Sequence, residues 1–351
     1  MNRNTTIDFI KFFAMIFIVY IHANAFENVN ILGVEGKKID LIIDTFARFG
    51  VPFFFMVSGY LVVNQVQNRG GKYFTGYIFK LVKLYVAWFL FFIFYDLLMK
   101  IINEGFKTGV LWDYVASYNS LEVFYYGAGH TQYHLWYLLA AIWGMVIFSI
   151  FYYFQKTNIL FFISLTLYLI GLLDQSYSGI YNLYFNSRDG IFFGLFYITL
   201  GAMFAQSKNT IGFSYRIKPA VWLVTFFGLS FIQVVERVVT IYWMNGKEGN
   251  YFISTIPIVI VLFLFIINKP DIGKGSWVNY IGKQTVGIYV VHTAVINITN
   301  QLIDYWELNY FREHLLWGIL FTPYIFFFSY ATYMTIQKLK KEALLRLKKN
   351  A

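Results

Sequence analysis

The chain of 351 residues contains no cysteine. This absence excludes disulfides, thiolate nucleophiles, cysteine-based metal sites and any acyl transfer through a thioester on the protein itself. Charged residues are also scarce, at 13% of the chain, whereas soluble domains usually carry about 25%. Because hydrophobic residues reach 58%, the composition excludes a disordered chain as well as an ordinary soluble one. What remains is a polytopic membrane protein.

Two kinds of sequence motif are missing as well. The chain has neither a P-loop nor an Asp-x-Asp pair, so nothing indicates nucleotide-sugar chemistry. The first apolar segment is long and is not followed by an A-x-A-like cleavage site. We therefore expect that segment to be a retained span and not a cleaved signal peptide.

Apolar segments long enough to cross a bilayer, which takes about 20 residues, recur along the chain. We expect an all-α transmembrane bundle of about ten spans, forming a single membrane-embedded domain over residues 1–351. The predicted spans are residues 7–26, 40–63, 77–99, 134–154, 158–174, 189–206, 219–242, 251–268, 281–303 and 315–337.

Positive charge is concentrated in alternate loops. Every loop on the side of the N-terminus has an excess of Lys and Arg, including the loop with Lys208 and Arg216, and no loop on the opposite side does. Cytoplasmic loops carry such an excess, so we predict a multi-pass protein of the cell membrane with both termini cytoplasmic. Residues 338–351 form a basic cytoplasmic tail that meets anionic lipid. Topology thus accounts for the net charge of +10, and no nucleic-acid partner is expected.

The first predicted span carries the ionisable residues Asp8, Lys11 and His22. Such groups are costly inside a bilayer, so each one calls for a partner or a function. An ideal helix places Lys11 and His22 on nearly the same face, roughly 16 Å apart along its axis. Asp8 lies one turn before Lys11 and can pair with it. The alternative interpretation is a Lys11 that snorkels to the inner surface and an interfacial His22.

The second predicted span combines an ion pair, a proline and two small residues. Asp44 and Arg48 are four positions apart in the order that favours a helical ion pair. Pro52 can kink the helix, and Ser58 and Gly59 permit close helix packing. A purely structural role explains the small residues better than it explains Arg48.

Further titratable residues lie at or below the opposite membrane face on other predicted spans. His134 and Arg188 open the fourth and sixth spans, Glu236 lies near the outer end of the seventh, and His292 lies near the middle of the ninth. If these residues converge, they form a polar, partly dehydrated pocket in which the pKa of a histidine can be tuned.

The order of these blocks resembles the acyltransferase-3 family of integral membrane acyltransferases. In that family a basic residue, usually Arg, precedes a His with ten residues between them, and this chain has Lys11 at the basic position. The resemblance extends over nearly the whole chain. The blocks that carry it are Asp8 to Lys11 with His22, Arg48 to Tyr60, His134 to Leu138, Arg188 to Gly194, and Gly287 to His292.

The resemblance implies transfer of an acyl group, usually acetyl from cytoplasmic acetyl-CoA, to a hydroxyl on an extracytoplasmic acceptor such as a cell-surface glycan. His22 would act either as the general base toward that hydroxyl or as a nucleophile that is acylated first. The sequence leaves both roles open, although an oxygen acceptor favours the base. Asp8 would orient Lys11, and no metal is expected.

The remaining residues of the expected site fall into three groups. The candidates for binding the phosphates of CoA are Lys11, Lys80 and Lys83, of which the last two are equally explained as positive-inside residues. The candidates for stabilising the oxyanion are Arg48, His134 and Arg188. The candidates for binding the acceptor substrate are Trp136, Ser58, Tyr60, Glu236 and His292.

Two other classes of membrane protein remain open. Buried charges and spans interrupted by Gly or Pro also fit a transporter or flippase for a glycan precursor. That alternative predicts no dependence on CoA and no essential His22. A receptor-like or structural protein predicts tolerance to substitution at every buried charge.

Overall fold

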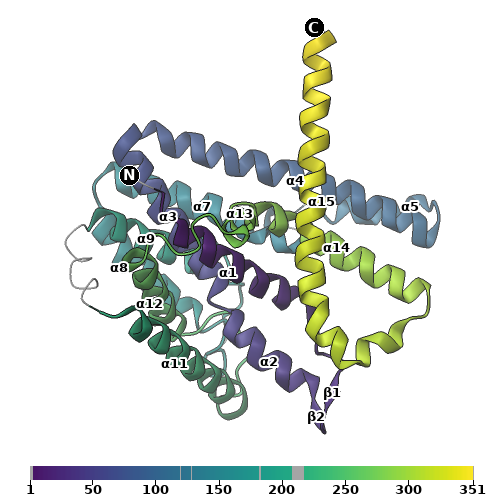
Figure 1. The fold of residues 1–351 in the computed structure, drawn as a ribbon, viewed down its shortest axis with the longest axis horizontal. Helices are drawn as coiled ribbons and strands as arrows, with labels where there is room; N and C mark the ends of the chain where they lie inside the picture. Colours follow the sequence, from purple (N-terminus) through teal and green to yellow (C-terminus); the bar gives the residue numbers. More distant parts are fainter. Residues whose placement is uncertain (1–2, 119, 128, 182, 208–216, 351) are drawn as a thin grey trace. The chain divides into compact units, whose positions relative to one another are not determined.

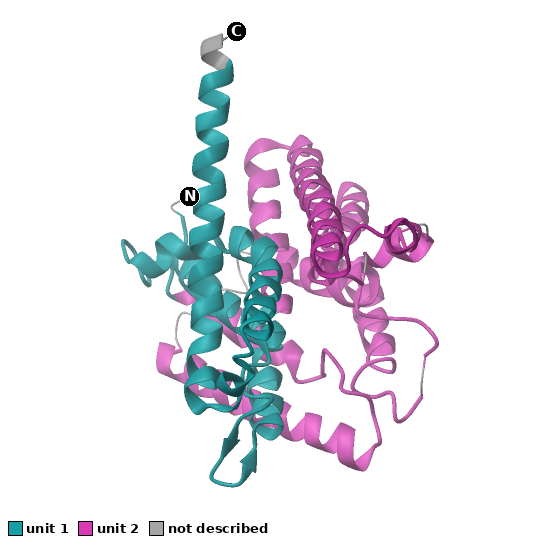
Figure 2. Cartoon of the chain, turned by 90° about the vertical axis from the view of Figure 1, so that its right-hand side faces the viewer, with its two compact units in different colours: residues 1–50, 269–351 teal, residues 51–268 magenta. Residues whose placement is uncertain are grey.

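The computed structural model describes residues 3–118, 120–127, 129–181, 183–207 and 217–350, which are mostly helical (Figure 1). Lys208 and Arg216, which belong to a loop used for the predicted orientation, lie outside these residues. The chain divides into two compact units (Figure 2). Unit 1 comprises residues 1–50 and 269–351, and unit 2 comprises residues 51–268.

Seven helices in the described part of the chain are long and apolar enough to cross a membrane, and three apolar helices are shorter. Together they match the ten predicted segments in order, so the all-α multi-pass character is confirmed. The shorter helices are Thr157–Gly171, Gly190–Gln206 and Thr255–Asn268. The number of complete spans, the side of the termini and the single-domain organisation stay predictions.

Unit 1 is built around helix α1. Asn4 caps its start by accepting a hydrogen bond from the Ile7 N–H, and Asn24 ends it in the left-handed conformation. The Phe12 ring meets the Trp277 and Phe326 rings edge to face, which fixes α13 and α15 against α1. The elements are α1 (Thr5–Ala23), β1 (Asn30–Ile31), β2 (Val34–Glu35), α2 (Gly36–Ala47), α13 (Trp277–Gly282), α14 (Thr285–Tyr305), η4 (Asn309–Glu313) and α15 (Leu315–Asn350).

The second predicted span, which belongs to the candidate span Gly36–Arg69, is interrupted just before Pro52. Helix α2 ends at Ala47, and α3 (Gly50–Arg69) begins three residues later. Pro52 has no N–H to donate, and its ring would clash with the carbonyl of Arg48, four residues earlier, in a continuous helix. The chain therefore breaks at Arg48, which becomes the C-cap residue of α2.

Unit 2 has an aromatic core. Tyr168, Tyr197 and Tyr251 are fully buried, and the Tyr168 hydroxyl donates to the carbonyl of Phe252. The short helices α5 and α6 lie between α4 and α7 in the sequence. Besides α3, the elements are α4 (Lys72–Glu104), α5 (Thr108–Ala116), α6 (Leu121–Tyr126), η1 (Tyr133–Leu135), α7 (Trp136–Tyr153), α8 (Thr157–Gly171), η2 (Gly190–Gly194), α9 (Leu195–Gln206), α11 (Pro219–Val238), η3 (Val239–Trp243) and α12 (Thr255–Asn268).

Helices α3 and α9 of unit 2 touch backbone to backbone through two glycines. A Cβ atom added to Gly59 would lie 2.0 Å from the carbonyl oxygen of Ile198. A Cβ atom added to Gly201 would lie 1.9 Å from the carbonyl oxygen of Met56. The close packing predicted at Gly59 is therefore present, and it is reciprocal.

Candidate functional site

Two histidines from distant parts of the sequence meet in unit 1. His22 lies in the last turn of α1, and His292 lies fully buried in α14. Their ring centroids are 5.1 Å apart. The Nδ1 atom of His292 is 2.6 Å from the carbonyl oxygen of Tyr289. A carbonyl oxygen can only accept, so Nδ1 of His292 carries the hydrogen and Nε2 is the acceptor of the neutral ring.

The first turn of α1 holds a cluster of charges in unit 1. The buried carboxylate of Asp8 lies 2.7 Å from Nη2 of Arg3 and 3.7 Å from Nζ of Lys11. The predicted pairing of Asp8 with Lys11 is therefore present, and Arg3, for which no role was predicted, also pairs with Asp8. Two cations share one carboxylate, so the cluster has a net positive charge.

The face of α1 between Lys11 and His22 packs against protein. Met15 and Ile18, which complete the predicted stripe, are buried, and the Lys11 side chain is only 20% exposed. His22 is half-buried. The stripe between Lys11 and His22 therefore packs against protein and does not face lipid.

Arg48 forms the predicted pair with Asp44. Its Nη2 lies 2.8 and 2.7 Å from the two carboxylate oxygens, and its Nε lies 3.0 Å from Oδ2. The two side chains are 15% and 14% exposed. The pair is thus a structural element at the end of α2, and the role of Arg48 toward an oxyanion stays a prediction.

Replacing Arg48 by Met is expected to destabilise the protein by roughly 2 kcal/mol, because it leaves a largely buried Asp44 carboxylate without its counter-charge. The double variant Arg48→Met with Asp44→Asn should recover part of this loss, because no buried charge then lacks a partner. Thermal unfolding of the purified variants measures both changes. Equal stability of the wild type and Arg48→Met would contradict this interpretation.

In unit 2, Arg188 and Trp136 come together from different predicted spans. The guanidinium carbon of Arg188 lies 4.9 Å from the centre of the Trp136 ring, and its Nη1 donates to the side-chain oxygen of Asn250 at 3.0 Å. Asn250 was missed in the sequence analysis because no local pattern singles out a loop amide. His134 is fully buried, with its ring edge-on to Phe92 at 5.2 Å.

Asp189, next to Arg188, joins the start of η2 to α6 in unit 2. Its carboxylate accepts hydrogen bonds from the N–H groups of Ile191 and Phe192 and from the Tyr125 hydroxyl at 2.7 Å. An Asp directly before an apolar helix is an N-cap signal, so the sequence could have indicated this role.

Glu236 has a structural role in unit 2. Its carboxylate accepts from the N–H groups of Ile253 and Ser254, at 2.8 and 3.0 Å, and from the Tyr177 hydroxyl at 2.7 Å. These hydrogen bonds link the end of α11 to the residues just before α12. Acceptor binding by Glu236 stays a prediction.

The other predicted residues of unit 2 lie apart from these clusters. Lys80 and Lys83 are exposed, and the Lys83 ammonium lies 4.5 Å from the centre of the Phe79 ring. Ser58 and Tyr60 are half-buried on α3, where Tyr60 packs edge to face on Phe263. Their contributions to binding stay predictions.

A family model described as an acyltransferase domain matches residues 4–334. The chain belongs to the acyltransferase-3 family. The match covers Asp8 and Lys11 of the charge cluster, the histidine pair and every block that carried the resemblance. Its apolar helices give this acyltransferase-family protein a multi-pass membrane character.

Curated relatives of the acyltransferase-3 protein are named for another activity. It is 25% identical over 323 residues to an amino-acid racemase of Enterococcus faecalis, covering 87% of this chain and 42% of the relative. It is 27% identical over 320 residues to a second amino-acid racemase of that species, covering 85% and 40%. A serine/alanine racemase of Enterococcus gallinarum is 25% identical over 319 residues, with coverages of 86% and 42%.

The acyltransferase-3 protein thus spans less than half the length of these curated relatives. No solved structure matches it.

Proposed function

We propose that this acyltransferase moves an acetyl group from cytoplasmic acetyl-CoA to a hydroxyl of an extracytoplasmic acceptor, of which a cell-surface glycan is the leading class. The observation that carries the proposal is the contact between His22 and His292 at 5.1 Å. It supplies a general base with a second imidazole beside it. The positive cluster around Lys11 lies on the same helix as His22, and the CoA donor is an anion.

In the proposed reaction His22 takes the proton of the acceptor hydroxyl while the oxygen attacks the thioester carbonyl. The C–S bond then breaks, and the sulfur of CoA leaves with the proton that His22 had taken. The products are an O-acetyl ester and CoA with a free thiol. His292 acts as a positioning residue, because its Nδ1–H is held by the Tyr289 carbonyl and its Nε2 can accept a hydrogen bond.

The alternative in which His22 is the nucleophile differs in one measurable step. An acetyl-histidine would form before the acceptor binds. Purified protein mixed with acetyl-CoA alone would then release one equivalent of CoA in a burst. The general-base mechanism expects no burst without an acceptor.

The absence of cysteine provides a direct assay of the proposed function. A thiol reagent such as dithionitrobenzoate measures released CoA with no background from protein thiols, because the chain has none. We expect acceptor-dependent release of CoA from acetyl-CoA by purified protein in nanodiscs. Absence of release with every acceptor would contradict the proposal and favour the transporter or flippase alternative, whereas release that does not depend on an acceptor would contradict transfer to a hydroxyl acceptor.

The names of the curated relatives suggest additional acceptors. They are amino-acid and serine/alanine racemases, so serine and alanine belong in the acceptor panel beside surface polysaccharides and lipid-linked sugars. Racemisation itself concerns those whole proteins, of which this chain spans less than half the length.

Acetyl-CoA at saturating concentration is expected to raise the thermal midpoint of the wild-type protein, since a ligand at 100 times its Kd stabilises by about 2.7 kcal/mol. Replacing Lys11 by Ala should reduce this shift by half or more, because the positive cluster loses one of its two cations. Lys37→Ala, which removes an exposed lysine on α2 of the same unit, is the matched control. An equal shift in all three proteins would show that Lys11 takes no part in donor binding.

A further inference from the structure

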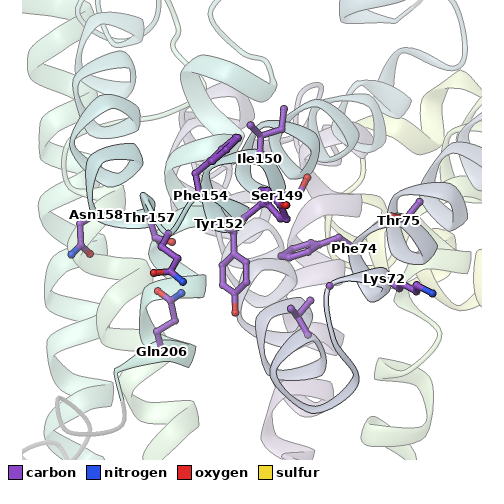
Figure 3. A pocket seen from close by; sticks show the side chains of 14 residues that line it. Lys72, Phe74, Thr75, Ser149, Ile150, Tyr152, Phe154, Thr157, Asn158 and Gln206 are labelled. Atoms are coloured by element: carbon purple, nitrogen blue, oxygen red, sulfur yellow. The ribbon is translucent and has the colours of Figure 1, made fainter.

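Unit 2 contains a cavity of about 920 Å³ where α4 and α8 begin and α7 and α9 end (Figure 3). Under the predicted topology these helix ends all lie on the cytoplasmic side. We propose that this cavity binds the adenosine 3′-phosphate end of CoA. The inference rests on the proposed function, which makes acyl-CoA the donor, and it extends that function to a site that the sequence motifs do not mark.

The N-terminus of α8 can bind an anion, because no side chain caps its first N–H groups. Its N-cap residue, Lys156, makes no side-chain capping hydrogen bond. The backbone N–H groups of Thr157, Asn158 and Ile159 donate to no acceptor within the described part of the chain. The first N–H groups of a helix, together with the helix dipole, favour a phosphate. Thr157 and Asn158 both line the cavity.

A second observation at the same place is the side chain of Thr157. This residue is only 6% exposed, yet across the described residues its hydroxyl makes no hydrogen bond. The hydroxyl is open to the cavity that Thr157 lines, so it can donate a hydrogen bond to a ligand or a water there. A phosphate oxygen held by the α8 N–H groups would accept from this hydroxyl.

The charge of the lining also suits an anion. Among the described residues no aspartate or glutamate lines this cavity, whereas Lys72 does. Figure 3 shows Lys72 on the side of the cavity opposite to Thr157 and Gln206. A second cavity of unit 2, of about 440 Å³, has Asp174 and Glu248 in its lining beside Arg188 and Lys247, so its charges of the two signs balance.

The lining of the cavity can also bind the purine ring. Phe74 and Tyr152 form an edge-to-face pair with ring centroids 5.2 Å apart, and both line the cavity. Aromatic faces stack on purines, and the amides of Asn158 and Gln206 supply donors and acceptors for a base edge. The volume falls within the roughly 300–1,000 Å³ of small-molecule sites.

The test measures binding of adenosine 3′,5′-bisphosphate, which has the 3′-phosphate of CoA but no thioester and cannot react. The full-length protein is placed in phosphatidylcholine nanodiscs, and adenosine 5′-monophosphate serves as the ligand that lacks the 3′-phosphate. We expect the wild type to prefer the bisphosphate, and Thr157→Val and Lys72→Gln each to weaken its binding about tenfold. Thr108→Val, at the first position of α5 in the same unit, is the matched control and should bind like the wild type.

Neither Thr157→Val nor Lys72→Gln is expected to disturb folding. Valine has the shape of threonine, and the Thr157 hydroxyl contributes no hydrogen bond that the fold would lose. Lys72 is exposed. A wild type that does not bind the bisphosphate, or variants that bind it as the wild type does, would overturn the proposal.

Two further measurements distinguish a failure of the cavity proposal from a failure of the proposed function. If the cavity holds an anionic lipid headgroup, phosphatidylglycerol in the nanodisc will displace the bisphosphate while phosphatidylcholine will not; complete displacement would assign the site to lipid. CoA release from acetyl-CoA is measured in parallel. Retained CoA release without bisphosphate binding overturns this site alone, whereas loss of both in the wild type overturns the proposed function too.

Discussion

Replacing His22 by Ala is expected to lower kcat for acetyl transfer by roughly 10²–10⁴-fold, the usual contribution of a general base. The imidazole of His22 lies beside that of His292, so the substitution removes the group that takes the hydroxyl proton while the ring that positions it stays in place. Acceptor-dependent release of CoA, followed by mass spectrometry of the acetylated product, measures the loss. The thermal midpoint should change little, because His22 is only half-buried.

The matched control for His22 is His314→Ala. His314 belongs to the same unit, but it lies in the loop before α15, where its ring packs near Tyr310 and Phe311. Its removal should leave kcat within about twofold of the wild type. If His22→Ala kept the wild-type rate at equal expression, neither the general-base nor the nucleophile mechanism could stand.

Replacing Gly59 by Ala is expected to destabilise the protein by roughly 3 kcal/mol or more, the upper end for overpacking. The added methyl group would lie 2.0 Å from a backbone oxygen of α9, and a backbone cannot move aside as a flexible side chain can. We expect a sharply reduced yield of monodisperse protein in detergent and a lower thermal midpoint. Gly201→Ala should have the same effect, because the contact is reciprocal.

Gly228→Ala on α11 is expected to have the opposite effect on stability. A Cβ atom added at Gly228 meets nothing within 4 Å, and alanine is favoured over glycine in a helix by about 1 kcal/mol. This variant should therefore be as stable as the wild type or slightly more so. Equal behaviour of Gly59→Ala and Gly228→Ala would contradict the close approach of α3 and α9.

The sequence predicted those features that depend on a single helix. The periodicity of α1 places Lys11 and His22 on one buried face, and the spacing of Asp44 and Arg48 predicts their ion pair. Both follow from the geometry of one helix, which is fixed by residue number. Pro52 was expected to kink a span, and the span Gly36–Arg69 is interrupted just before it, at Arg48 and Phe49.

Contacts between distant segments could not be predicted in the same way. His292 was placed only near the middle of its span, because its approach to His22 depends on how α14 packs on α1. Glu236 was grouped with the site on the ground that a buried charge needs a function. Its hydrogen bonds to Ile253 and Ser254 show that it can equally need a structural partner.

The most direct test of the central claim is the sidedness of transfer. Acetyl-CoA with a labelled acetyl group is supplied only on the cytoplasmic face of sealed vesicles that contain the protein, and the acceptor is supplied only on the opposite face. We predict base-labile label on the acceptor with the wild type and His314→Ala, and none with His22→Ala. Label that stays on the donor side with the wild type, or that reaches the acceptor equally with His22→Ala, would contradict the account.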